Sequence, residues 1–178
     1  MSFIAATKYL PGIFWACSLV VKHGPDKTES QVRFLALLPI YKEDLVGDLN
    51  YFNLSGYIEK YNTKIFIETG TYKGAGVEYA QKFDFDEIHS CEIYIPVTEE
   101  LILRFKKDKR VRIFPGTSFT FLRCILPYVE GNILFWLDSH YPAGGLLKEG
   151  ERIQVAPEFV LPLEDELFLV KEIRKNNR

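Results

Sequence analysis

The sequence predicts a three-layer α/β fold, in which a parallel sheet carries helices on both faces. Short apolar segments alternate with helical segments between Lys64 and Leu137, and the connections between them are short, as in sheets built from right-handed crossovers. The segment 132–137 is also apolar almost throughout, which is typical of a strand buried on both faces. Ligands of such sheets bind beyond the carboxyl ends of the strands.

The elements before Lys64 are less sharply patterned. We expect a strand at about 13–21 and a short helix at 54–61, while 30–38 fits either a short helix or a strand. The length of the chain suits one domain. We therefore expect the N-terminal segment 1–60 to pack on or cover the sheet, and 61–178 to form the α/β domain.

The alternating block is predicted to order four strands with three helices. The expected strands are 65–67, 87–93, 111–114 and 132–137, and the expected helices are 75–83, 98–107 and 119–126. Leu101 and Phe105 lie four residues apart and give the second helix an apolar face. After a loop rich in glycine and proline, Pro162 opens a last helix with acids near its positive end and bases near its negative end.

Composition excludes several classes of protein. The 178 residues include 22 basic and 24 acidic ones, for a formal charge of −2, so we expect no general electrostatic binding of nucleic acid. Cys17, Cys91 and Cys124 lie far apart and form no metal-binding or disulfide pattern, which fits a reducing compartment.

No apolar run reaches the roughly 18 residues that span a bilayer. The longest is 13–21, and the Pro-Gly and Gly-Pro pairs that flank it favour a strand over a signal peptide. We expect a cytoplasmic protein without a membrane partner.

A glycine-rich turn, Ile67-Glu-Thr-Gly-Thr-Tyr-Lys-Gly-Ala-Gly76, joins the first strand of the block to its helix. Gly70 and Gly74 allow a tight turn and a close approach to a ligand, although a turn without a ligand would need the same residues. The sequence has no P-loop motif. The spacing matches the cofactor turn of short-chain dehydrogenases, but no tyrosine has the lysine four positions later that those enzymes carry.

Two acidic residues lie near the carboxyl ends of the first two strands of this block, where a ligand would bind. Glu68 stands two residues before the first glycine, where it would repel a pyrophosphate and attract a cationic group. Glu92 ends the next strand, 18 residues after Gly74, where an acid can accept two ribose hydroxyls. A solvated acid at a strand end is the alternative for Glu92.

These motifs, with Pro115-Gly-Thr-Ser118 and Phe135-Trp-Leu-Asp-Ser-His-Tyr, resemble the class I S-adenosylmethionine-dependent methyltransferases. The last motif is similar to a subgroup of bacterial methyltransferase-like proteins with Leu-Asp-[Gly/Ser]-His-Tyr. The resemblance runs from about Lys64 to Gly145. It implies a Rossmann-like fold of seven strands, of which this sequence has four recognisable ones, so we expect an incomplete fold that is truncated at the carboxyl terminus.

The resemblance implies S-adenosylmethionine as cofactor. Glu68, Gly70 and Gly74 would hold its aminoacyl end, Glu92 its ribose and Ser118 the adenine edge. The alternative for Ser118 is to cap the helix that follows.

The resemblance also implies catalytic roles for Asp138 and His140. They lie two residues apart, so in strand geometry both face the expected methyl site. His140 would be a general base and Asp138 would orient the acceptor, whereas the alternative for His140 is a packed structural histidine. The further acids that a metal would need are missing, so we expect no metal site.

We expect a methyltransferase-like protein that methylates oxygen or nitrogen of a small-molecule acceptor. The alternative is a non-catalytic or fragmentary relative that acts as an interaction module. Because segment 133–137 would form a bare apolar edge without a fifth strand, we expect it to be covered by the 13–21 segment or by a second copy in a homodimer.

Overall fold

The computed structural model of the chain describes residues 17–23, 30–36, 49–139 and 162–176. Within these ranges the strands are β1 (Cys17–His23), β2 (Ser30–Ala36), β3 (Ile65–Thr69), β4 (Glu87–Glu92), β5 (Val111–Pro115) and β6 (Ile133–Leu137). The helices are the short 3-10 helix η1 (Leu49–Tyr51), α1 (Ser55–Tyr61), α2 (Ala75–Ala80), α3 (Ile95–Phe105), α4 (Ser118–Ile125) and α5 (Leu163–Asn176).

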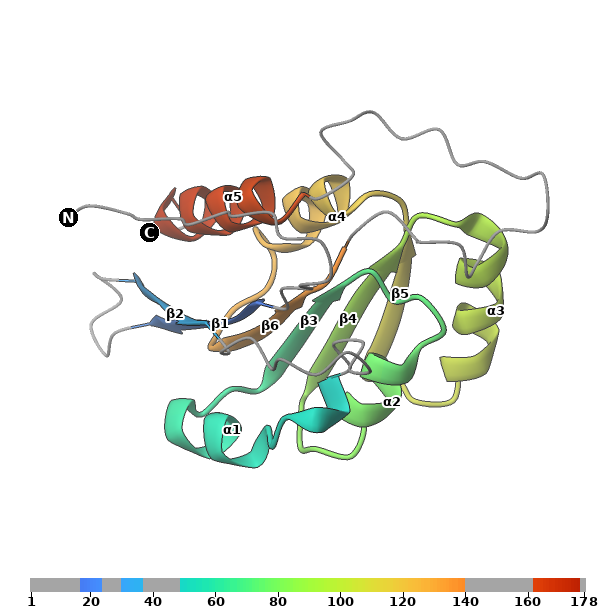
Figure 1. Cartoon of the computed structure of the whole chain (residues 1–178), viewed down its shortest axis with the longest axis horizontal. Coiled ribbons are helices and arrows are strands. Elements are labelled where there is room, and N and C mark those ends of the chain that lie inside the picture. The colour runs from blue at the N-terminus through green and yellow to red at the C-terminus, as the bar shows by residue number, and fades with distance from the viewer. Residues whose placement is uncertain (1–16, 24–29, 37–48, 140–161, 177–178) are drawn as a thin grey trace, which may run out of the picture.

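The described strands form one six-stranded sheet in the order β2-β1-β6-β3-β4-β5. β6, β3, β4 and β5 run parallel, as the sequence predicts, and β3 lies between β4 and β6. The crossover helices place the carboxyl ends of these four strands at one edge of the sheet, which is the upper right edge in Figure 1. The α/β prediction with a parallel core is therefore confirmed.

The outer edge of β6 is covered by β1. The two strands pair antiparallel, with Leu19 opposite Phe135 and Val21 opposite Ile133. Every residue of β6 is buried, and an apolar strand of this kind cannot remain an open edge. The prediction that the 13–21 segment covers this edge is confirmed for the part of it that the structure describes, residues 17–21. β2 extends the sheet by a second antiparallel pairing, which settles 30–36 as a strand.

Two apolar cores lie on opposite faces of the sheet. Ile65 and Ile67 of β3 face a core that includes Phe121 and Leu122 of α4 and Val170 of α5. The alternate residue Phe66 faces the other core, which η1, α2 and α3 supply with the side chains Leu49, Val77, Ala80, Leu101 and Phe105. Figure 1 shows α4 and α5 together on one face and α1 and α2 on the other.

Two helices, α2 and α3, differ from their predicted bounds by more than one residue. α3 begins at Ile95 rather than at residue 98, because Pro96 is compatible with a first helical turn, where its missing N–H is not needed. α2 ends at Ala80 rather than at residue 83. The amides of Lys82 and Phe83 donate to carbonyls three residues back, which is the hydrogen-bond pattern of a 3-10 turn and ends the α-helix.

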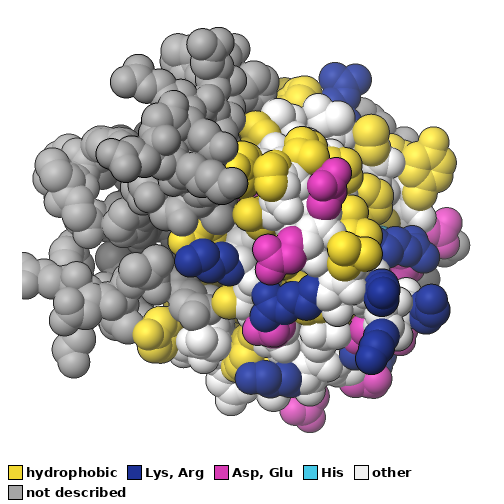
Figure 2. Space-filling view, turned by 90° about the vertical axis from the view of Figure 1, so that its right-hand side faces the viewer, with side chains coloured by type: hydrophobic (Ala, Val, Ile, Leu, Met, Phe, Trp, Pro, Cys, Tyr) yellow, Lys and Arg dark blue, Asp and Glu magenta, His cyan; other side chains and the backbone are white. Residues whose placement is uncertain are grey.

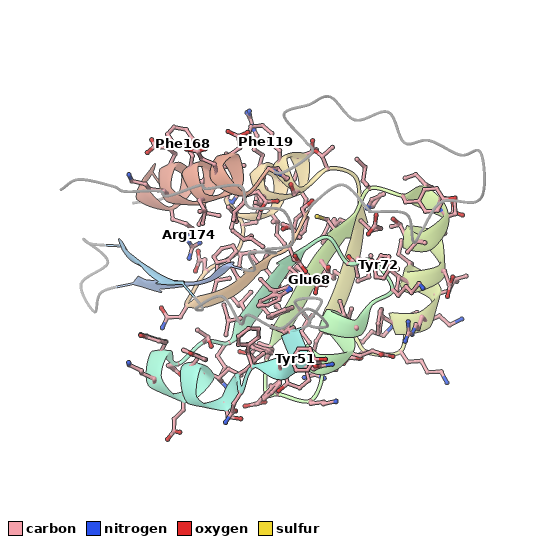
Figure 3. All side chains as sticks on the ribbon, viewed as in Figure 1. Tyr51, Glu68, Tyr72, Phe119, Phe168 and Arg174 are labelled. Atoms are coloured by element: carbon pink, nitrogen blue, oxygen red, sulfur yellow. The ribbon has the colours of Figure 1, made fainter. Side chains whose placement is uncertain are left out.

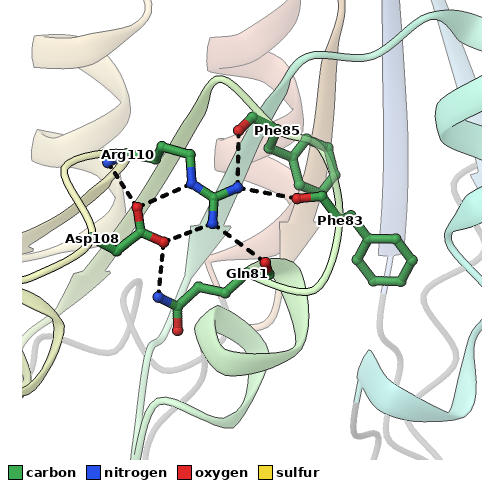
Figure 4. Close-up of polar contacts among 5 residues, drawn as sticks. All are labelled: Gln81, Phe83, Phe85, Asp108 and Arg110. Atoms are coloured by element: carbon green, nitrogen blue, oxygen red, sulfur yellow. Dashed lines mark hydrogen bonds and ion pairs between the residues drawn. The ribbon is translucent and has the colours of Figure 1, made fainter.

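Arg110 joins the end of α2 to the turn before β5 (Figure 4). Its guanidinium donates to both carboxylate oxygens of Asp108, at 3.0 and 2.7 Å. It also donates to the carbonyls of Gln81, Phe83 and Phe85 at 3.1–3.3 Å. The hydrogen bonds from Arg110 are the first cause that holds the pKa of Asp108 well below its usual range.

We predict that Arg110→Ala lowers the free energy of unfolding by about 1–2 kcal/mol, because three carbonyls and one carboxylate lose a donor at a partly exposed site. Arg112→Ala is the matched control, since the side chain of Arg112 is 61% exposed and its ion pair with Glu87 is long, at 3.6 Å. Urea unfolding of the two variants measures the difference. Equal stability of both variants would contradict this account of Arg110.

None of the described helices is long and apolar enough to cross a membrane. Figure 2, which faces the α3 end of the molecule, shows basic and acidic side chains interleaved there with hydrophobic ones.

Candidate functional site

The glycine turn between β3 and α2 lies at the carboxyl edge of the sheet. Gly70 and Gly74 adopt φ values of +82° and +86°, which confirms that the turn uses the conformational freedom of glycine. Gly70 also packs so closely on the chain after β6 that a Cβ atom would lie 2.8 Å from the carbonyl oxygen of Asp138. The turn therefore links the ends of β3 and β6.

Backbone amides of this turn already have acceptors within the protein. The amides of Gly70 and Thr71 both donate to the carbonyl of Cys91, at 3.0 Å, and the amide of Gly74 donates to the carbonyl of Thr71 at 2.8 Å. The amide of Tyr72 donates to the Glu92 carboxylate at 2.8 Å, with Tyr72 itself at a left-handed φ of 50°. The turn is thus held against the end of β4.

Glu92 is the residue around which the end of β4 is organised. Its carboxylate is 5% exposed and accepts from two backbone amides, with Oε2 bonded to Tyr72 and Oε1 to Tyr94 at 2.9 Å. Its carbonyl accepts from Gly116 and from the Thr98 hydroxyl. Each carboxylate oxygen has a second lone pair, so the group can accept further hydrogen bonds, such as those of a diol. The predicted contact with ribose stays a prediction.

Glu68 lies on the α2 face of β3, inside the molecule (Figure 3). The Ser90 hydroxyl donates to its Oε2 at 2.6 Å, and Thr71 in turn donates to Ser90 at 2.6 Å. The backbone of Gly76 packs against Oε1 so tightly that a Cβ atom at residue 76 would lie 1.8 Å from it. The carboxylate is 3% exposed, and its place beside the first turn of α2 requires a residue without a side chain there.

We predict that Gly76→Ala destabilises the protein by about 1–3 kcal/mol, because the new methyl group must displace Glu68. Gly56→Ala is the control. It lies within α1, has open space around it and is expected to leave stability unchanged or raise it by up to about 1 kcal/mol. Thermal and denaturant unfolding measure both. A Gly76→Ala variant as stable as Gly56→Ala would show that Glu68 moves freely.

Asp138 follows β6 and lies next to the turn. Its amide donates to the carbonyl of Thr69 at 3.1 Å, and the residue is half-buried at the open end of the sheet. The structure therefore brings Asp138 together with Gly70, as expected from parallel strands. His140, its predicted catalytic partner, lies outside the described residues, and its role stays a prediction.

Ser118 is buried at the start of α4, with 3% of its surface exposed. The alternative in which Ser118 caps this helix is wrong, because Thr117 is the cap and its hydroxyl accepts from the amide of Thr120 at 3.2 Å. The predicted contact between Ser118 and adenine is untested.

Glu166 is a residue of this region that the sequence analysis missed as a candidate. It lies in the first turn of α5 and is only 1% exposed. Burial raises the pKa of its carboxyl to about 7, and the hydroxyls of Ser118 and Thr69 partly offset that increase. Neither of its oxygens makes a hydrogen bond of ordinary geometry within the described residues. A signal was present, since Glu166 precedes the core residues Leu169 and Val170 by three and four positions and so shares their face.

We predict that Glu166→Gln stabilises the protein at neutral and higher pH. Between pH 4.5 and about 7 the folded protein retains a proton that the unfolded chain has released, so wild-type stability falls as pH rises through this range. The loss amounts to at most about 3 kcal/mol and is absent in Glu166→Gln. Unfolding measured at several pH values should show a difference that grows from pH 5 to pH 8. A difference independent of pH would contradict the assignment.

A metal centre receives no support from the described part of the chain, where no three His, Cys, Asp or Glu side chains gather in a way that could hold an ion.

No family model matches the sequence, and no curated protein matches it. Two solved structures are similar to it. One is a proposed O-methyltransferase from Klebsiella pneumoniae, with 19% identity and a TM-score of 0.35 over 46% of this chain and 39% of that chain. The other is a spermidine synthase from Thermotoga maritima, with 15% identity and a TM-score of 0.42 over 77% of this chain and 50% of that chain.

The chain therefore matches half or less of the length of each of these two proteins. Likenesses at these TM-scores carry no argument about function. The strand order and the parallel pairings of the sheet itself define the α/β fold.

Proposed function

We propose that this protein binds S-adenosylmethionine at the carboxyl edge of its sheet and is methyltransferase-like. The observation that supports the proposal is the position of two buried acids, Glu68 and Glu92, at the ends of adjacent parallel strands and on either side of a glycine turn. Crevices outside the carboxyl ends of such strands are where open α/β sheets bind ligands.

The residues at this edge fit the chemistry of the cofactor. Glu92 has lone pairs left for the ribose hydroxyls after its two amide bonds. Gly70 and Gly74 keep side chains away from the turn, where the aminoacyl end is expected, and Ser118 stands at the end of β5, where the adenine edge is expected. When bound, S-adenosylmethionine supplies an electrophilic methyl group.

The charge at this edge favours a sulfonium ligand over a phosphorylated one. Glu68, Glu92 and the half-buried Asp138 all lie at the strand ends, where low dielectric strengthens electrostatic interactions. A cationic sulfonium and an α-ammonium gain from this environment, whereas a pyrophosphate is repelled.

The acceptor that we propose is a hydroxyl or amine of a small molecule. In-line attack on a methyl group depends more on alignment than on strong acid or base catalysis. Asp138 would orient the acceptor and His140 would take its proton.

A second candidate function is an interaction module that has lost catalysis. The observation that favours it is the internal hydrogen bonding of the turn, in which the amides of Gly70, Thr71, Tyr72 and Gly74 already donate to the protein. A ligand carboxylate would then find fewer free donors. Binding measurements with the whole chain separate the two functions.

We predict that Glu92→Gln weakens S-adenosylmethionine binding by roughly tenfold to a hundredfold, because a charged acceptor of ribose hydroxyls is lost. Glu99→Gln is the matched control, as Glu99 lies exposed on α3 near the same edge. Isothermal titration calorimetry of the wild type and both variants gives the affinities, and thermal unfolding of each variant shows whether it is folded.

Equal affinity of wild type and a folded Glu92→Gln variant would remove Glu92 from the site. A wild-type chain that binds no S-adenosylmethionine at millimolar concentration would favour the interaction module.

A further inference from the structure

The helix α3 has an inner face that packs on the sheet and an outer face that is exposed. Thr98, Leu101 and Phe105 are buried and define the inner face. The outer face carries Ile102 and Leu103, which are 44% and 63% exposed. Figure 2 looks onto this end of the molecule and shows hydrophobic side chains at the surface among acidic and basic ones. Two exposed aliphatic side chains need no partner by themselves, so the charges around them decide what this face can bind.

The charged residues of the outer face are arranged symmetrically about the aliphatic pair. Glu99 lies one turn before Leu103, and Lys106, the C-cap residue of the helix, lies one turn after Ile102. These four side chains therefore form one stripe along the helix. The midpoint between Glu99 and Lys106 coincides with the midpoint between Ile102 and Leu103. The stripe thus reads the same from either end, except that an acid at one end corresponds to a base at the other.

The two charges of the stripe are not used within the described part of the chain. Glu99 and Lys106 are both exposed, and neither takes part in an ion pair among the described residues. Arg104, which also lies on α3, differs in this respect, because its guanidinium is paired with Glu78 of α2. An acid and a base of this kind, with aliphatic side chains between them, are available to a second molecule.

We propose that the stripe of Glu99, Ile102, Leu103 and Lys106 is an interface between two copies of this chain, in which the two α3 helices pack antiparallel. The two-fold axis passes between Ile102 and Leu103. Glu99 then faces the partner's Lys106, and Ile102 faces the partner's Leu103. A two-fold interface requires this kind of self-complementarity, because residue i meets residue j and residue j meets residue i.

A second copy fits the charges of this face better than a nucleic acid or an anionic membrane does. Those two surfaces attract Lys106 but repel Glu99 and Glu100, which are exposed on the same helix. An antiparallel copy uses charges of both signs, since each acid of the stripe meets a base. The pairing involves none of the residues proposed to bind the cofactor, so it stands apart from the proposed function.

The contact is small, and we expect the dimer to be weak. α3 is 11 residues long, which corresponds to about 16 Å of helix. Two helices of this length bury less surface than the roughly 1,200 Å² of the smaller stable interfaces. We expect half of the chains to be paired at a concentration of about 0.1–1 mM. The paired fraction should fall at high salt, because exposed ion pairs are screened.

The test is analytical ultracentrifugation of the full chain from micromolar to millimolar concentrations. Glu99→Lys and Lys106→Glu each place like charges opposite one another at both ends of the contact, so each should weaken dimerisation by about tenfold or more. Phe168→Ser is the control. Phe168 is 65% exposed on α5, far from α3 in the molecule (Figures 1 and 3), and its replacement should leave dimerisation unchanged.

Combining the two charge reversals separates this pairing from any other. The double variant that carries both Glu99→Lys and Lys106→Glu restores opposite charges at both ends of the contact. An equimolar mixture of the two single variants does the same, because a chain with two bases meets a chain with two acids. Both samples should dimerise within about threefold of the wild type. Thermal unfolding shows whether each variant is folded.

Recovery of dimerisation in both samples supports the antiparallel pairing. A wild-type chain that stays monomeric at millimolar concentration would overturn it, and so would single variants that dimerise as the wild type does, or a mixture that stays monomeric. A wild-type monomer that cosediments with phosphatidylserine vesicles, and loses this property in Lys106→Glu, would assign the stripe to a membrane surface and overturn the proposal as well.

Discussion

The burial of carboxyl groups at the ends of parallel strands is the constraint on which this structure depends. Glu68, Glu92 and Glu166 are each 5% exposed or less, and an ionised carboxylate without partners is costly to bury. Each meets the constraint differently. Glu68 accepts from the Ser90 hydroxyl, Glu92 accepts from two backbone amides, and Glu166 shifts its pKa toward neutrality. The packing of Glu68 requires the glycine at residue 76. The hydrogen bond to Glu92 accompanies the left-handed φ of Tyr72.

The parallel core could be predicted from the sequence because its signals are local. Segments such as 133–137 are apolar throughout, and short connections to amphipathic helices allow few topologies. The cover of β6 by β1 followed from the same reasoning about edges. β2 could not be assigned, because residues 30–38 fit a strand and a short helix equally well. Glu166 escaped notice because acids in a first helical turn usually complement the helix dipole, and its burial depends on how α5 packs on the sheet.

Glu92 connects the structural and the functional account of the edge. Its two amide bonds fix the turn of Tyr72 and the start of α3, so the same carboxylate that could bind a diol also holds the protein together. A ligand must therefore share Glu92 with the backbone or displace the Tyr72 amide.

We propose that negative charge at the carboxyl edge makes this protein bind a sulfonium ligand in preference to a pyrophosphate nucleotide. The most direct measurement is a pair of calorimetric titrations of the full chain, one with S-adenosylmethionine and one with NAD at the same ionic strength. The account predicts saturable binding of S-adenosylmethionine and none of NAD at millimolar concentration. Binding of NAD with equal or higher affinity would contradict it.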